Sequence, residues 1–185
     1  MAKIGLDNLK YGVLTEGDQG QATYGTETKL AKAVEASVEI TNNEAVLYAD
    51  NGVAESDYSF NNGTITLTID DGDDTVFAQL LGHTVSDGEM IRSSNDTAPY
   101  VGVGRIIQKV VGGVQKYKVE FLKKVKFQEP SQSESTKGEN VEFSTTEIVG
   151  AIMTLSDGTW SVTQTFDTKQ EAITYLSGLF VNTSV

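Results

Sequence analysis

The 185-residue sequence predicts a single domain of the mainly β class, a β-sandwich or barrel with one or two short flanking helices. Three observations lead to this prediction. Apolar and polar residues alternate over several stretches, as they do in strands that bury one face. Asn-Gly and Gly-Gly pairs separate these stretches and supply the positive φ angles of hairpin turns. Only two short segments have helical spacing of their apolar residues.

The first half of the chain is predicted to be a meander of hairpins. Four runs there have β character: 34–40, 45–48, 58–60 and 65–69. Two Asn-Gly pairs punctuate them: Asn51-Gly52 and Asn62-Gly63. Because this dipeptide favours two-residue hairpin turns, we expect a turn at each pair.

A short helix and a long hairpin are expected in the middle of the chain. The apolar spacing predicts a helix over 75–82, with acidic Asp73 and Asp74 at its N-terminus and Gly82 just after its end. Strands are then expected at 100–111 and 115–128, joined through a Gly-Gly turn at 112–113.

Residues 128–140 contain Pro130 and no other apolar residue, so they are predicted to form an exposed loop. Strand character then returns in three runs: 141–144, 147–155 and 159–166. A final helix is expected to start at Thr168, which has the spacing of a capping box with Glu171. Three residues would form its apolar stripe: Ile173, Leu176 and Phe180.

Composition excludes several function classes. The chain has no Cys, so disulfides, thiolate zinc sites, iron–sulfur clusters and cysteine nucleophiles are excluded. A net charge of −12 disfavours a surface that grips a nucleic-acid backbone, so a repressor or packaging role is not expected. The start, Met1–Asn8, has no export signal, and no apolar run is long enough to cross a bilayer. We therefore expect no membrane partner and synthesis in a reducing cytoplasm.

The chain carries no recognisable catalytic motif. His83 is the only histidine, and its place beside Gly82 predicts that it satisfies carbonyls at the helix end. The acidic run 70–74 lacks the spacing of a calcium loop and is predicted to be a turn leading into the helix. Gly102-x-Gly104 lacks the third Gly of a dinucleotide fingerprint. We expect no catalytic, cofactor-binding or metal-binding residue, and no enzyme activity.

Charge distribution is the most informative feature of the sequence. The span 105–126 holds seven of the 14 Lys and Arg residues and one acid, Glu120. Alternation predicts that four lysines share one face of the strand 115–128: Lys116, Lys118, Lys124 and Lys126. Acids that could form a matching surface lie elsewhere: Glu44, Asp50, Glu55, Asp57, Asp70, Asp71, Asp73 and Asp74.

This basic strip has three interpretations. Lysines commonly solvate and protect a sheet edge. Nucleic-acid binding is a second reading, although no exposed aromatic residues accompany the lysines for base stacking. The third is self-association, because unlike surfaces on identical chains join head to tail into rings or filaments. On this hypothesis the lysine face contacts acidic segments of a neighbouring copy.

A set of segments in order along nearly the whole chain is similar to a known family. The segments are Ala2–Tyr11, Tyr48–Asp57, Leu81–Thr84, Ala98–Arg105, Lys116–Phe121, Glu129–Ser133 and Thr136–Gly138. They resemble the major tail proteins, or tail-tube proteins, of long non-contractile-tailed phages, specifically the phi13-type group.

The resemblance implies a tail-tube-type fold, a β-sandwich flanked by a helix, whose copies form hexameric rings that stack into a hollow tube. DNA would pass through the tube during ejection without specific binding, and the family has no catalytic residues. The implied partners are the tape-measure, tail-terminator and distal-tail proteins. The protein would be made in the host cytoplasm and reside in the virion. An N-terminal arm, residues 1–12, and the loop 128–140 are further interface candidates.

The alternative is a monomeric β-sandwich binding module, of carbohydrate or adhesin type, displayed on a virion or cell surface. Such a site usually presents aromatic side chains on a sheet. Trp160 is the sole Trp and stands beside Ser161 and Val162 in an alternating run, which predicts a place in the core.

Overall fold

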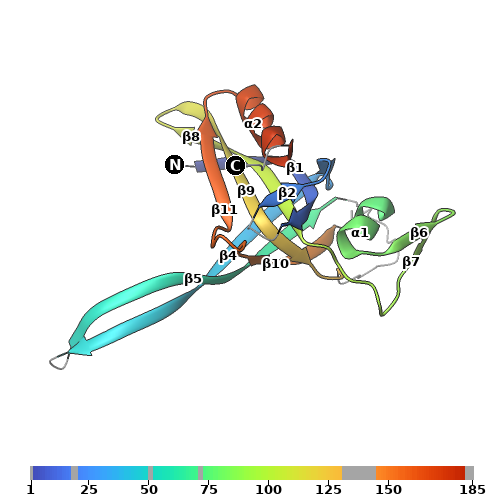
Figure 1. Cartoon of the computed structure of the whole chain (residues 1–185). Coiled ribbons are helices and arrows are strands. Elements are labelled where there is room, and N and C mark those ends of the chain that lie inside the picture. Colours follow the sequence, from blue (N-terminus) through green and yellow to red (C-terminus); the bar gives the residue numbers. More distant parts are fainter. Residues whose placement is uncertain (1, 18–20, 50–51, 71–72, 131–144, 182–185) are drawn as a thin grey trace, which may run out of the picture.

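The computed structural model describes residues 2–17, 21–49, 52–70, 73–130 and 145–181. It confirms the mainly β class with two short helices (Figure 1). The elements are, in chain order, β1 (Ala2–Glu16), β2 (Ala22–Tyr24), β3 (Thr28–Lys29), β4 (Ala33–Ala49), β5 (Gly52–Ile69), α1 (Asp74–Leu81), β6 (Thr84–Ser86), β7 (Glu89–Ile91), β8 (Val101–Val111), β9 (Val114–Phe127), β10 (Thr146–Met153), β11 (Ser161–Phe166) and α2 (Lys169–Val181).

Nine of these strands form one antiparallel sheet. Its main path runs β2-β1-β8-β9-β10-β5-β4, with β3 added to β1 and β11 added to β9. β9 is the branch point, because its residues 117–122 pair with β11 whereas 124–127 pair with β10. β6 and β7 make a separate two-stranded sheet. The sandwich-or-barrel arrangement expected from the sequence thus takes the form of one branched sheet.

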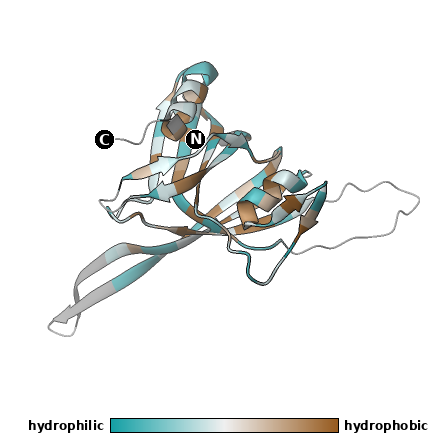
Figure 2. Cartoon of the chain, turned by 45° about the vertical axis from the view of Figure 1, so that its right-hand side comes forward, coloured by the Kyte–Doolittle hydropathy of each residue, from teal (hydrophilic) through white to brown (hydrophobic). Residues whose placement is uncertain are grey.

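The branched sheet carries an apolar cluster on each face, and Figure 2 shows hydrophobic residues gathered in the body of the molecule. Leu122 belongs to the cluster that includes α1, and Phe121 to the cluster that includes α2. These two residues are consecutive in β9, and successive strand residues point to opposite faces. The helices therefore cover opposite faces of the sheet, which we call the α1 face and the α2 face.

A single long hairpin, β4–β5, replaces the predicted meander. The two strands pair from Ala33 to Ala49, and they project far from the body (Figure 1). Of the two predicted turns, Asn51-Gly52 falls where the strands join, and Asn51 lies outside the described residues. Gly63, by contrast, lies inside β5 opposite Ile40. A Cβ on Gly63 would come 2.8 Å from Cδ1 of Ile40, so this glycine permits close packing and makes no turn.

The predicted N-terminal arm is also corrected. Residues 2–12 belong to β1, which pairs with β8 along most of its length and with β3 at its middle. Leu9 and Tyr11 are buried in the α1-face cluster. These apolar side chains anchor the segment in the core, which explains why it is a strand. Of the predicted loop 128–140, residues 131–140 lie outside the described part of the chain, as does the expected strand 141–144.

Several local predictions are confirmed. Gly112 and Gly113 have φ angles of 59° and 81° and close the β8–β9 hairpin. Asp73 caps α1 and Gly82 ends it at a φ of 79°. In the capping box of α2, the Glu171 N–H donates to Thr168 Oγ1 at 3.3 Å, and the Thr168 N–H donates back at the same distance.

Candidate interaction surface

The four candidate lysines of β9 do not share a face, contrary to the prediction. β9 carries one extra residue between Leu122 and Val125 relative to its partner β8. Such a bulge inverts the alternation of side chains beyond it. The candidates are divided accordingly: Lys116 and Lys118 on the α1 face, Lys124 and Lys126 on the α2 face.

On the α1 face three basic groups are paired with carboxylates within the chain: Arg105, Lys116 and Lys118. Arg105 is 7% exposed, and its Nε donates to the Glu120 carboxylate at 2.7 Å. Lys118 Nζ lies 3.8 Å from the same carboxylate, and Lys116 pairs with Asp167. Each of these three cations therefore already has a carboxylate, whereas Lys109, opposite Lys116, donates to the Thr165 hydroxyl and makes no ion pair within the described chain.

On the α2 face two ammonium groups share one aromatic ring. The Nζ atoms of Lys124 and Lys126 lie 4.8 and 5.3 Å from the centre of the Tyr100 ring. Lys124 also pairs with Glu16 at 2.6 Å, and this hydrogen bond is the main cause that lowers the pKa of Glu16 to about 2. Lys126 makes no ion pair with a described carboxylate. We call Tyr100, Lys124 and Lys126 the basic patch; sequence reasoning missed its aromatic member.

The predicted acidic counter-surface is only partly described. Asp70 accepts a hydrogen bond from the Lys32 N–H at 3.1 Å, and Asp73 accepts one from the Thr75 N–H as the cap of α1. Asp74 lies exposed in the first turn of α1. Asp50 and Asp71 lie outside the described residues, as do the side chains of Glu55 and Asp57. Asp70 and Asp73 therefore serve local structure beside α1.

The β4–β5 hairpin is the most acidic element of the chain. Residues 33–69 contain six carboxylic acids and no Lys, Arg or His: Glu35, Glu39, Glu44, Asp50, Glu55 and Asp57. In its distal half, Tyr58 is 60% exposed and its hydroxyl donates to Glu44 at 2.8 Å. This hydrogen bond raises the pKa of the Tyr58 hydroxyl. The hairpin thus presents a carboxylate and an aromatic ring together to solvent.

His83 has a different role from the predicted one. Its main-chain N–H, not its ring, satisfies the end of α1 by donating to the Ala78 carbonyl. The buried ring contacts two carboxylates, with Nδ1 2.7 Å from Asp96 and Nε2 facing Glu129. The hydrogen bond to His83 is the largest cause that lowers the pKa of Asp96. The histidine therefore joins α1 to the segments before β8 and after β9.

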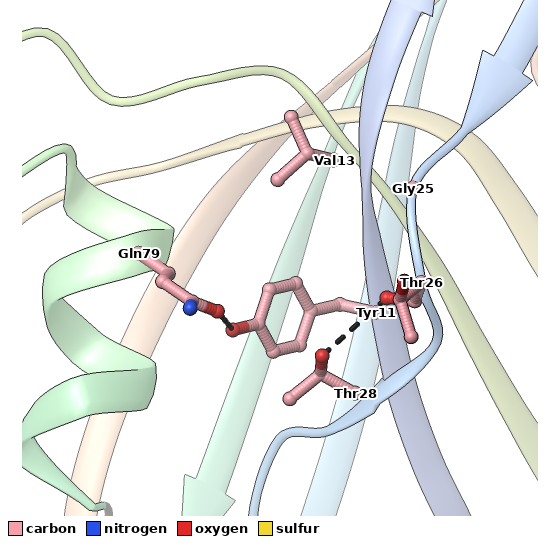
Figure 3. A pocket seen from close by; sticks show the side chains of 6 residues that line it. All are labelled: Tyr11, Val13, Gly25, Thr26, Thr28 and Gln79. Carbon is pink, nitrogen blue, oxygen red and sulfur yellow. Dashed lines mark hydrogen bonds between the residues drawn. The ribbon is translucent and has the colours of Figure 1, made fainter.

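A pocket of about 380 Å³ lies between α1 and β1 (Figure 3). At its wall the Tyr11 hydroxyl donates to Gln79 Oε1 at 2.9 Å, and burial raises the pKa of this hydroxyl. Its lining residues are all uncharged: Tyr11, Val13, Gly25, Thr26, Thr28 and Gln79. Without a carboxylate, an imidazole or a cation, this lining has no general acid or base suited to neutral pH.

Neither the described side chains nor comparisons with known proteins assign the chain to a functional class. Within the described ranges, no group of three His, Asp or Glu residues is placed to hold a metal ion. None of the helices described is long and apolar enough to span a membrane. No protein-family model matches the sequence, and no curated protein is significantly similar to it.

Proposed function

We propose that the chain is a structural virion protein that assembles with itself into stacked hexameric rings, which form the tail tube of a long non-contractile-tailed phage. The tube would conduct DNA during ejection, and its neighbours would be the tape-measure, tail-terminator and distal-tail proteins. The phage assignment is supported by the ordered motifs that resemble the tail-tube family. The observation that best supports self-assembly is the projecting β4–β5 hairpin.

An isolated two-stranded hairpin is at best marginally stable in water. The pairing of β5 with β10 spans only Gly63 to Ile69, and beyond that region the two hairpin strands pair with each other alone. A long protruding hairpin of this kind is consistent with an element that is held by another copy. The projecting hairpin therefore favours an assembling subunit over a solitary domain.

The edges of the sheet support the same proposal. β4 ends the strand order, so along its described length its outer edge has no strand partner. Unpaired edges are templates for a further strand. When the edge of each copy joins a different surface of the next copy, the contact is head to tail and closes into a ring if the rotation permits. Strands from several copies would then surround a lumen.

Negative-stain microscopy of the purified chain tests the proposal. We expect tubes or six-fold rings, promoted by high protein concentration. A chain that remains monomeric at high concentration and binds glycans would instead be the monomeric binding module. Trp160 argues against that alternative, because its ring stacks on Phe60 with a centroid distance of 4.8 Å and packs against the α1-face cluster. A ring engaged in this way is not an open platform for a sugar.

A further inference from the structure

Among the described residues, the two lysines of the basic patch have only one carboxylate partner between them. Its Lys124 is matched by Glu16, whereas Lys126 has the Tyr100 ring and no described carboxylate. Tyr100 is itself 39% exposed. A half-buried ammonium beside an exposed aromatic ring favours a partner that brings both a carboxylate and an apolar surface.

The distal β4–β5 hairpin has the complementary chemistry. Glu44 and Tyr58 are exposed and hydrogen-bonded to each other, so a carboxylate and a ring are presented as a pair. The hairpin has no basic residue to repel the patch. Its many acids also make approach to a basic surface favourable over a longer range.

The hairpin cannot reach the patch of its own copy. Lys126 lies in a row with Ala151, Thr64 and Glu39 across β9, β10, β5 and β4. Glu44 is five residues farther along β4, which displaces it by roughly 16 Å. The hairpin also leads away from the body, which keeps its distal half apart from β9 (Figure 1). A distal hairpin that contacts this patch must therefore belong to a second copy.

We propose that the basic patch of one copy receives the distal β4–β5 hairpin of a second copy, with Glu44 and Tyr58 against Lys126 and Tyr100. The inference rests on the proposed self-assembly and names the surfaces that join. It also selects Lys126 over Lys116, because only the former has no carboxylate partner of its own within the described chain.

Site-specific cross-linking tests the contact directly, since the chain has no Cys of its own. One preparation carries Asn42→Cys, which is near Glu44 in β4. A second preparation carries Ala151→Cys in β10, beside Lys126 of β9. After mixing and assembly, a short bis-maleimide should join the two preparations about tenfold more than a matched pair with Thr163→Cys, which lies on the α1 face. Equal yields from the two pairs would overturn the inference.

Charge reversal supplies an independent readout. Lys126→Glu and Glu44→Lys should each raise the protein concentration needed for assembly at least about tenfold, because like charges would then meet. The chain carrying both changes should assemble nearly as well as the unmodified one. Lys116→Glu is the matched control and should have little effect. If Lys126→Glu assembles normally, the patch does not hold the hairpin, although tubes would still support the proposed function. If the unmodified chain never assembles, the proposed function itself fails.

Discussion

The β4–β5 and β8–β9 hairpins have the same local architecture and opposite roles. Both consist of two long antiparallel strands that follow each other directly in the chain. β8–β9 carries a net charge of +6, lies between the two apolar clusters and pairs with strands on both sides. β4–β5 carries a net charge of −6 and leaves the body. Local β propensity is therefore enough to form both hairpins. Only the hairpin with apolar side chains on both of its faces becomes part of the core.

The largest expected effect is the difference in stability lost when a residue of each hairpin is replaced. Phe121→Ala removes a buried ring that contacts Tyr24 and Phe180, and should lower the free energy of unfolding by about 3–5 kcal/mol. Tyr58→Ala in the distal hairpin should change it by no more than about 0.5 kcal/mol. Urea denaturation of the monomer measures both. Similar losses would show that the distal hairpin belongs to the folded core.

A second effect concerns the buried charge of β8–β9. Glu120→Gln leaves the guanidinium of Arg105 without its carboxylate. It should lower the free energy of unfolding by about 2–3 kcal/mol. Replacing both residues together, Arg105→Met with Glu120→Leu, should cost less, because no uncompensated charge remains. A double change that costs more than the single one would mean that the pair itself stabilises the fold.

A smaller effect depends on pH and tests the basic patch. Glu16→Gln should destabilise the protein by about 1 kcal/mol at pH 7, since the pair with Lys124 is partly open to solvent. The folded pKa of Glu16, about 2, lies below its ordinary value of 4.5. The stabilisation is therefore complete above pH 4.5 and is lost as the pH falls toward 2. Thermal unfolding of both proteins across this range should give curves that converge in acid.

Removing the distal hairpin should change stability little and abolish assembly. Replacing residues 43–59 by an Asn-Gly turn should leave the unfolding free energy of the body within about 1 kcal/mol, because the removed residues contribute no buried side chain to the described clusters. Microscopy should find no tubes. Normal tubes from the shortened chain would contradict the assembly role of the hairpin, and a shortened chain that fails to fold would contradict its independence from the core.

Local sequence signals predicted the parts of the fold that depend on near neighbours. The capping box of α2, the Gly-Gly turn and the Asp73 cap each involve residues close in the chain, so their geometry follows from residue type. The Asn62-Gly63 prediction failed because packing against Ile40 outweighed the turn preference. β1 was missed since its partner β8 lies far along the sequence and its own alternation is weak.

The candidate surface was less predictable, for a physical reason. A single inserted residue in β9 moves every later side chain to the other face, and no pattern in one strand reveals such a bulge. Glu16 and Tyr100 meet Lys124 only because β1, β8 and β9 are adjacent in the sheet. The concentration of lysines was visible in the sequence, but their partners depend on tertiary structure.

The position of β1 has a consequence for biosynthesis. Ala2 pairs with Val110, so β1 leaves the ribosome about a hundred residues before the strand that it pairs with. At elongation rates of about 5–20 residues per second this delay is roughly 5–20 s. During that interval Leu9 and Tyr11 have no core to enter, whereas β4–β5 can already close. Rapid translation, or a chaperone that shields nascent β1, would favour correct folding.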